Sequence, residues 1–285
     1  MSARRRLDTE LVRRGLAPSR ERAQADIAEG RVTVGGAPAT KPSRLVDPAE
    51  ALVVHGPPPQ YVSRAGAKLA GALERFDLQP WVEGARVLDA GASTGGFTDC
   101  LLQCGAAEVL AVDVGHNQLH ERLRADPRVR SLERTNLRTV DPGDLGTPCD
   151  LVVGDLSFIS LTLVLDTLDA ASIPGAIFVL LVKPQFEAGR AEVSRGRGII
   201  DSSAIWHRVV SEVSAALVER NAAIMGVMVS PITGSDGNVE FILVGRFAGS
   251  DDPIGARGPL DATALAAAIE QVTGHDPWAT VDGGH

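Results

Sequence analysis

Short apolar runs alternate with stretches of helical periodicity through the middle of the chain. The run 87–90 leads into the glycine-rich segment 91–96, and apolar residues at helical spacing follow it. Further short segments at 108–113, 129–133, 150–155 and 173–182, of which the last two are largely apolar, predict more strands of the same sheet. Two last runs, 224–229 and 239–245, flank a polar loop and predict a closing antiparallel pair. The pattern predicts an α/β fold with a mostly parallel sheet and an antiparallel last strand.

The first 55 residues follow a different pattern. Leu7, Leu11 and Val12 share one face of a predicted helix over 4–16, and a second helix follows to residue 29. Runs at 31–36 and 51–54 predict a small strand pair. The expected organisation is a small α+β domain over 1–55, a Pro-rich linker over 56–62, an α/β domain over 63–249, and a last segment over 250–285. We expect that segment to hold one helix and a disordered tail from His275.

Composition narrows the class of protein. The chain has 285 residues and is 44% hydrophobic, enough for a sizeable core. No apolar run approaches the roughly 18 residues of a membrane span, and no signal peptide precedes the first domain, so we expect a cytoplasmic protein without a membrane partner. The three cysteines lack metal-ligand spacing; we expect core residues and no bound metal.

Charge is unevenly distributed. The net charge is −8, yet residues 1–64 hold eleven Lys/Arg against seven Asp/Glu. A basic N-terminal region followed by an acidic remainder is expected where one domain binds a polyanion. Lysine is rare, since only Lys41, Lys68 and Lys183 occur. Unlike arginine, lysine can lose its proton in a protein, which draws attention to the two lysines of the α/β domain.

The glycine-rich segment predicts a ligand site. Its spacing is D-x-G-x-x-x-G-G from Asp89, not the G-x-G-x-x-G of a dinucleotide loop. A ligand carboxylate, as in S-adenosylmethionine, suits it better than a pyrophosphate, although another nucleotide remains an alternative. Asp113 ends the next strand, where an acid can accept ribose hydroxyls; capping the following helix is its alternative role.

Four ionisable residues are expected at one edge of the sheet: Lys68, Asp155, Lys183 and Glu240. A ribose hydroxyl becomes a good nucleophile when a base removes its proton, and a lysine can serve when burial and a second cation favour its neutral form. We expect Lys183 to be that base, held by Asp155 and Glu240 with Lys68 nearby. Taken singly, each of the four could instead belong to a surface ion pair.

The N-terminal domain resembles the S-four-like RNA-binding domain. The matching residues are Arg-Leu-Asp-x-x-Leu-Val at 6–12, Ser-Arg-x-x-Ala at 19–23 and Ile-x-x-Gly-x-Val-x-Val at 27–34. A solvated basic helical hairpin without a ligand is the alternative. The resemblance implies RNA contacts by Arg6, Arg20, Arg22 and Arg31.

The rest of the chain resembles FtsJ-like RNA 2′-O-methyltransferases. The Lys-Asp-Lys-Glu order, the glycine-rich segment, Asp-Leu-Ser-Phe-Ile-Ser at 155–160 and Gly-Asn-x-Glu-Phe at 237–241 carry it. With the N-terminal domain, residues 5–246 resemble the TlyA family, some members of which are described as haemolysins. The resemblance implies a Rossmann-like class I methyltransferase sheet, S-adenosylmethionine as cofactor, and cytidine 2′-hydroxyls of 16S or 23S ribosomal RNA, in 30S or 50S subunits, as substrate for a monomer. It implies catalytic roles for Lys68, Asp155, Lys183 and Glu240, an RNA contact at Arg64, and cofactor contacts at Asp89, Gly91, Ser93, Thr94, Gly95, Gly96, Phe97, Asp113 and Asn136.

Three other functions compete with this one. A methyltransferase acting on another RNA or on a base atom would favour an Asn-Pro-Pro-Tyr-type motif or a catalytic cysteine. A membrane-active haemolysin would require an apolar span or a cationic amphipathic stretch. A non-catalytic RNA-binding ribosome factor would not require two sequestered lysines. We also expect the glycine- and arginine-rich segment 189–198 to be a flexible loop beside the site, with a possible role as a lid.

Overall fold

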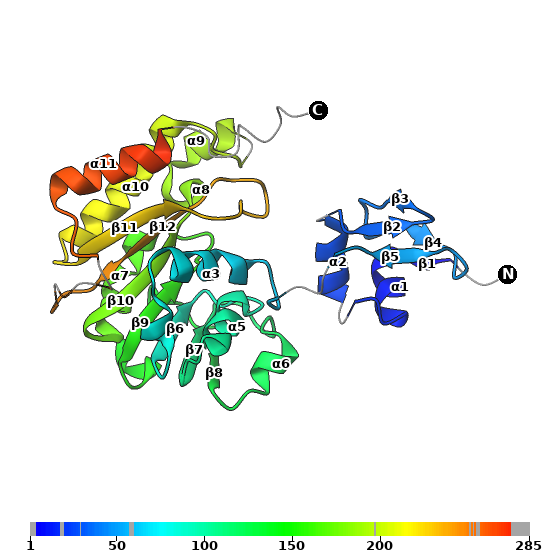
Figure 1. Ribbon diagram of the computed structural model, residues 1–285, viewed down its shortest axis with the longest axis horizontal. Coiled ribbons are helices and arrows are strands. Elements are labelled where there is room, and N and C mark those ends of the chain that lie inside the picture. The colour runs from blue at the N-terminus through cyan, green and yellow to red at the C-terminus, as the bar shows by residue number, and fades with distance from the viewer. Residues whose placement is uncertain are drawn as a thin grey trace. The chain divides into compact units, whose positions relative to one another are not determined.

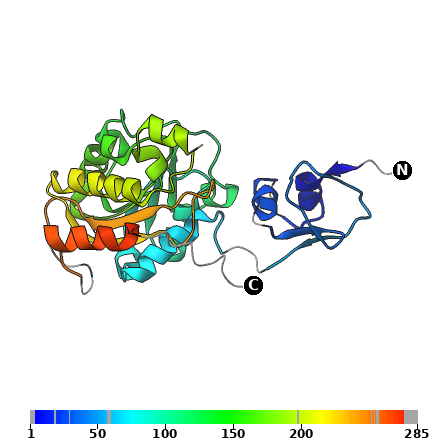
Figure 2. The same cartoon turned by 90° about the horizontal axis from the view of Figure 1, so that it is seen from above.

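The protein is described by a computed structural model over residues 4–17, 20–28, 30–56, 60–196, 198–250, 252, 254 and 257–274. The chain divides into two units, Met1–Gln60 and Tyr61–His285 (Figures 1 and 2). This division falls inside the expected linker 56–62, of which residues 57–59 lie outside the described part of the chain. The expected disordered tail from His275 lies outside it as well.

The first unit packs two helices against small antiparallel sheets. Helices α1 (Leu7–Arg13) and α2 (Arg20–Ala28) bury Leu7, Leu11 and Ile27 in one apolar core. The sequence pattern indicates the two strands β2 and β5, whereas the two-residue strands are too short to show a period. The strand order is β3–β2–β5, with a separate pair β1–β4; the bounds are β1 Arg5–Arg6, β2 Val32–Val34, β3 Ala37–Pro38, β4 Leu45–Val46 and β5 Leu52–Val54.

The second unit is organised around one mixed sheet. Among its described residues the sheet has seven strands in the order β11–β12–β10–β9–β6–β7–β8. Strand β12 runs antiparallel to both of its neighbours, as the closing strand pair predicts. The bounds are β6 Arg86–Ala90, β7 Glu108–Val112, β8 Val129–Leu132, β9 Cys149–Gly154, β10 Ser172–Val182, β11 Ala223–Val229 and β12 Phe241–Arg246.

Helices cover both faces of this sheet (Figure 1). Because side chains alternate along a strand, Phe178 and Leu180 of β10 pack with α7 and α10, whereas Val179 and Leu181 pack with α3 and α5. The helix bounds are α3 Ala65–Arg75, α4 Gln79–Val82, α5 Gly96–Gln103, α6 Glu121–Arg124, α7 Leu165–Ala170, α8 Pro184–Glu187, α9 Arg190–Arg195, α10 Ser203–Val218 and α11 Ala262–Thr273, with 3₁₀ turns η1 Pro142–Leu145 and η2 Leu161–Leu163. Across the described residues, no helix is both long enough and apolar enough to cross a membrane.

The strand order creates a binding position between β6 and β9. From β6 the chain proceeds outward to β7 and β8, and it then returns to the other side of β6 to form β9 and β10. In open α/β sheets, ligands bind at the carboxyl ends of the strands where the order reverses in this way. Gly91, Asp155 and Lys183 directly follow the strands β6, β9 and β10 at this edge.

The segment 189–198 differs from the expected flexible loop. It contains α9, whose first turn is stabilised by Glu192 Oε2 accepting a hydrogen bond from the backbone N–H of Gly189 at 3.1 Å. Arg208 of α10 also holds Glu192, at 2.6 Å. The glycines of this segment concealed the helix from the sequence pattern. Arg197 lies outside the described residues.

Candidate active site

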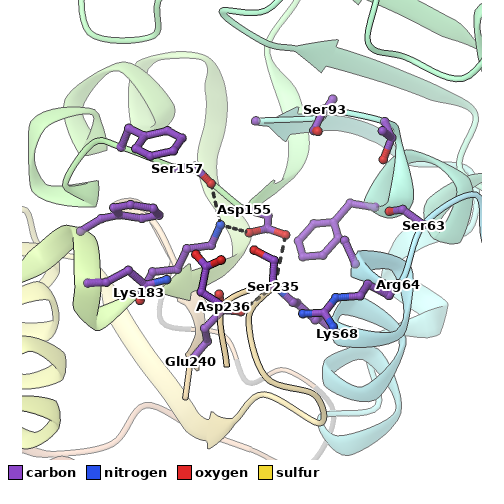
Figure 3. A pocket seen from close by; sticks show the side chains of 18 of the residues that line it. Ser63, Arg64, Lys68, Ser93, Asp155, Ser157, Lys183, Ser235, Asp236 and Glu240 are labelled. Atoms are coloured by element: carbon purple, nitrogen blue, oxygen red, sulfur yellow. Dashed lines mark hydrogen bonds and ion pairs between the residues drawn. The ribbon is translucent and has the colours of Figure 1, made fainter. Parts of the chain in front are cut away.

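Lys68, Asp155, Lys183 and Glu240 meet in one cluster although they come from four elements (Figure 3). Lys183 Nζ lies 2.5 Å from Asp155 Oδ1. Lys68 Nζ lies 3.7 Å from Asp155 Oδ2 and 2.6 Å from Glu240 Oε2. The charges therefore alternate along a chain from Lys183 through Asp155 and Lys68 to Glu240.

One expected contact is different. Glu240 pairs with Lys68, and the second partner of Lys183 is Ser157, whose Oγ accepts a hydrogen bond from Nζ at 3.0 Å. The physical reason is the strand order. Asp155 follows β9, which is a direct neighbour of β10 and therefore lies beside Lys183, whereas Glu240 precedes β12 and faces α3.

The cluster is not a set of surface ion pairs. The side chains of Lys68, Lys183 and Glu240 are 6%, 9% and 2% exposed. Removing charges from water is costly, and hydrophobic residues often stabilise a fold as well as a buried ion pair does. Such a cluster at a cavity is typical of a functional site.

A cavity of about 690 Å³ opens beside the cluster. This volume lies within the range of roughly 300–1,000 Å³ that is usual for small-molecule sites. The cavity is bordered on one side by the glycine-rich segment and on the other by Phe158 and Phe186. Of the expected cofactor residues, Gly91, Ser93, Thr94 and Phe97 line it.

The backbone of the glycine-rich segment requires glycine at two positions. Gly91 and Gly95 have φ values of +86° and +95°, and a Cβ on Gly91 would lie 2.9 Å from the backbone oxygen of Asp155. Ser93 also has a positive φ, +48°. Left-handed backbone at a non-glycine residue is strained and is found preferentially at ligand sites.

Asp113 lies next to this segment. Its carboxylate accepts hydrogen bonds from the backbone N–H of Ser93 at 2.8 Å and of Gly115 at 2.6 Å. Asp113 borders a second, smaller cavity, which shares Ala92 and Ser93 with the first. Asn136 is exposed, and its Oδ1 accepts a hydrogen bond from the N–H of Arg138. It borders neither of these two cavities.

Two other expected cofactor residues, Asp89 and Gly96, border neither of the two cavities. Asp89 is fully buried and accepts a hydrogen bond from Thr98 Oγ1 at 2.6 Å. Burial raises its pKa to about 7. Gly96 allows α5 to approach α3, since a Cβ there would lie 2.9 Å from the Cβ of Ala65, the first residue of α3. The contacts of Asp89 and Gly96 are therefore with neighbouring parts of the protein, Thr98 and the start of α3.

Phe158 is a residue that the sequence analysis did not single out. Its side chain is 92% exposed, its φ is +64°, and its ring lies 5.0 Å from that of Phe186. Lys183 Nζ lies 5.7 Å from the Phe186 ring. An apolar ring exposed to water is unfavourable, and so is a left-handed backbone at a residue with a bulky side chain. Because Phe158 combines both features, a ligand contact is indicated. The available signal was the position of Phe158 in the Asp-Leu-Ser-Phe sequence that begins at Asp155.

The four arginines of the first unit that were expected to bind RNA all form ion pairs within that unit. Arg6 and Arg20 both pair with Asp8 at 2.9 Å, while Arg22 and Arg31 both pair with Asp26. Arg22 is only 9% exposed, so its position is that of a structural residue. Arg6 and Arg20 remain about half exposed and can still reach a phosphate. Arg64, in the second unit, lines the cavity and donates to the backbone oxygen of Thr233 at 2.7 Å.

Replacing Asp8 by alanine should destabilise the first unit by about 2 kcal/mol. The Asp8 side chain is fully buried, and hydrogen bonds chiefly from Arg6 hold its pKa well below the usual range. Its removal leaves Arg6, Arg20 and Gln24 without their acceptor. Amide hydrogen exchange should accelerate across residues 4–56 and stay unchanged across 61–250. If amides in residues 4–56 exchanged no faster in the variant than in the wild type, this role of Asp8 would be contradicted.

None of the three cysteines lines the cavity. Among the described residues, no group of three His, Cys, Asp or Glu side chains could hold a metal ion. Cys100 and Cys149 are buried, and burial raises the pKa of the Cys100 thiol to about 12. A thiol in this state is a poor nucleophile.

Comparisons with known proteins agree with the geometry. A model of the FtsJ-like methyltransferase family matches residues 61–247, and a model of the S4 domain matches residues 5–52. The 16S/23S rRNA (cytidine-2′-O)-methyltransferase TlyA of Mycobacterium tuberculosis is 48% identical over 263 residues, which cover 92% of this chain and 97% of the relative. The "Putative rRNA methyltransferase YqxC" of Bacillus subtilis is 44% identical over 244 residues, 85% of each chain. A solved structure named "Putative hemolysin", from Streptococcus thermophilus, is 38% identical with a TM-score of 0.71 and covers 95% of this chain and 96% of that one.

The seven-stranded sheet with its antiparallel β12 is the class I methyltransferase fold, joined here to a small α+β domain. The match of the FtsJ-like model over most of the second unit agrees with this class. Within it, the chain belongs to the TlyA family, which combines an S4 domain with an FtsJ-like methyltransferase domain.

Proposed function

We propose that this protein transfers a methyl group from S-adenosylmethionine to the 2′-hydroxyl of a cytidine in ribosomal RNA. The observation that carries the proposal is the buried pair of Lys183 and Asp155 at the edge of a cavity that the glycine-rich segment also borders. The activity printed for the relative at 48% identity supports it. Because ribosomal RNA is the substrate, the cytoplasm is the compartment that this proposal implies.

The residues present fit the cofactor. The left-handed Gly91 lets the backbone come close to a ligand, and the segment leads into the N-terminus of α5. Asp113 is positioned by two backbone N–H groups next to the second cavity, where its carboxylate can accept ribose hydroxyls. When bound, S-adenosylmethionine supplies a methyl group activated by its sulfonium and retains the electron pair of the carbon–sulfur bond that breaks.

The lysine cluster acts on the RNA hydroxyl. Lys183 Nζ, in its neutral form, accepts the proton of the 2′-hydroxyl and becomes an ammonium, so that the ribose oxygen can form its new bond to carbon. The amines of Lys68 and Lys183 lie near the same carboxylate, so Asp155 is shared between the two lysines. Asp155 and Ser157 fix the direction of the amine.

The proposal is tested by transfer of tritiated methyl groups to purified 30S and 50S subunits. Ribose analysis of the product should find the label on a 2′-oxygen. Label on a base atom would indicate the base-directed alternative, and no label on either subunit would refute the proposal. Calorimetry with S-adenosylmethionine then tests for a non-catalytic binding factor, and leakage from liposomes tests for a membrane-active haemolysin.

Replacing Phe158 by alanine should weaken productive RNA binding by about tenfold. Stacking of a base on an aromatic ring contributes about 1–3 kcal/mol, and the exposed Phe158 ring beside Lys183 is available to the base of the target nucleotide. The expected result is a higher KM for the subunit with an unchanged affinity for S-adenosylmethionine. Phe158→Tyr keeps a stacking surface and should keep the KM. An equal loss in both variants would argue against stacking.

A further inference from the structure

Asp236 is the one carboxylate bordering the cavity whose charge is not paired within the described part of the chain. The other two, Asp155 and Glu240, each contact a lysine. Asp236 makes no hydrogen bond or ion pair with the residues that the structure describes, and its side chain is exposed. Figure 3 shows it in the pocket beside Ser235, on the loop that precedes β12.

The loop that carries Asp236 is held in place from several sides. Arg64 donates to Thr233 O, and Gly234 N–H donates to Asn238 O at 2.8 Å. Asn238 is buried, accepts a hydrogen bond from Ile200 N–H and donates to Gly198 O, each at 2.9 Å. A side chain on such a loop can recognise a ligand with little loss of conformational entropy.

The sheet order places Asp236 on the RNA side of the site. Its loop precedes β12, and β12 is separated from β6 by β10 and β9. The glycine-rich segment that would hold the cofactor follows β6, whereas Lys183 follows β10, the direct neighbour of β12. Asp236 therefore borders the half of the cavity where the methyl acceptor must lie.

A carboxylate in this half requires a hydrogen-bond donor. It repels phosphates, and in its ionised form it can only accept hydrogen bonds. Cytosine carries an exocyclic N4 amine, a donor, where uracil carries the O4 acceptor. Gln185 also borders the cavity, and its buried Oε1 lacks a hydrogen-bond partner among the described residues. Its carboxamide can turn to suit either base, so it cannot discriminate between them.

We propose that Asp236 selects cytidine over uridine by accepting a hydrogen bond from the N4 amine of the target base. This inference rests on the proposed ribose methylation and adds the residue that chooses the nucleotide. Uridine would place its O4 against the carboxylate, where two acceptors repel each other. Asp236 acts as a specificity residue and takes no part in the proton transfer.

The test compares two substrates in competition. The modified cytidine is first located with the wild-type, full-length protein, and subunits carrying uridine at that position are then prepared. The wild type should prefer cytidine by about tenfold or more in kcat/KM. Asp236→Asn should bring the preference to within about threefold, because a carboxamide can donate to O4 as well as accept from N4. The affinity for S-adenosylmethionine, measured by calorimetry, should not change.

Ser235→Ala is the matched control, since a hydroxyl both donates and accepts and should not affect the preference. An Asp236→Asn protein with the wild-type preference would overturn the inference. A loss of cofactor affinity in that variant would also overturn it, because Asp236 would then face the cofactor. Methylation with an unchanged preference refutes this inference alone, whereas absence of 2′-O-methylation by the wild type refutes the proposed function too.

Discussion

Replacing Lys183 by alanine is expected to lower the rate of methyl transfer by about a thousandfold while cofactor binding persists. A positioned general base contributes about 10²–10⁴ in rate. Lys183 follows β10, which β9 separates from the strand that leads into the glycine-rich segment, and its side-chain amine contacts Asp155 and Ser157. Single-turnover methyl transfer to the modified subunit measures the rate, and calorimetry with S-adenosylmethionine shows whether the cofactor site is intact.

Lys183→Arg separates proton transfer from charge. Arginine retains the cation and can pair with Asp155, but it does not lose its proton in a protein. If Lys183 is the base, arginine should be nearly as inactive as alanine. Recovery of activity with arginine would show that Lys183 only positions the substrate or stabilises charge. A pH–rate profile of the wild type that lacks an ascending limb would argue in the same direction.

Gly91→Ala is expected to reduce both cofactor binding and methyl transfer, by about a hundredfold or more in kcat/KM. The new Cβ would lie 2.9 Å from the backbone oxygen of Asp155 and 3.1 Å from Leu156 Cδ2. The backbone at Gly91 or Asp155 has to move to relieve this contact. Such a movement would also displace the Asp155 carboxylate, which contacts both lysines of the cluster. Misplacing reacting groups by about 1 Å can cost a hundredfold in rate. Calorimetry and kinetics on the same protein give the two effects.

Gly84→Ala is the matched control for this substitution. Gly84 has a φ of +73° and nothing within 4 Å of the position a Cβ would take. Both alanines carry the cost of a left-handed backbone, roughly 1–2 kcal/mol in stability. Only Gly91→Ala adds the contact with the backbone of Asp155. Equal losses of activity in the two variants would assign the effect to stability and not to the site.

The two-domain organisation and the α/β class could be predicted because they depend on local patterns. Strand β10 is apolar without interruption from Ala176 to Val182 and is followed by Lys183, and β6 is followed by Gly91, where the glycine-rich segment begins. The short helices α4, α6 and α8 could not be predicted in this way. Each has four residues and completes little more than one turn, which is too short to display a helical period.

The candidate site was predictable as a set of residues but not as a set of contacts. A sequence can show that Asp155 and Lys183 follow strands, because the ends of parallel strands meet at one edge of a sheet. It cannot show that Glu240 pairs with Lys68, that Asn136 faces solvent, or that Arg22 is buried against Asp26. Those facts depend on strand order and on how far each side chain reaches. Family resemblance supplied the functional roles, and the structure supplied the pairing.

Local sequence is enough to predict the strand ends at which Asp155 and Lys183 lie and the glycines at which the chain turns. These features depend on a few residues that are neighbours in the sequence, so they do not require knowledge of the rest of the fold. Only the assembled structure shows that Phe158 is exposed at the cavity that the two lysines also line, and that Asp236 borders this cavity without a charge partner among the described residues. The exposure of a side chain and its charge partners depend on segments that are distant in the sequence. Those segments come together only when the whole sheet has assembled.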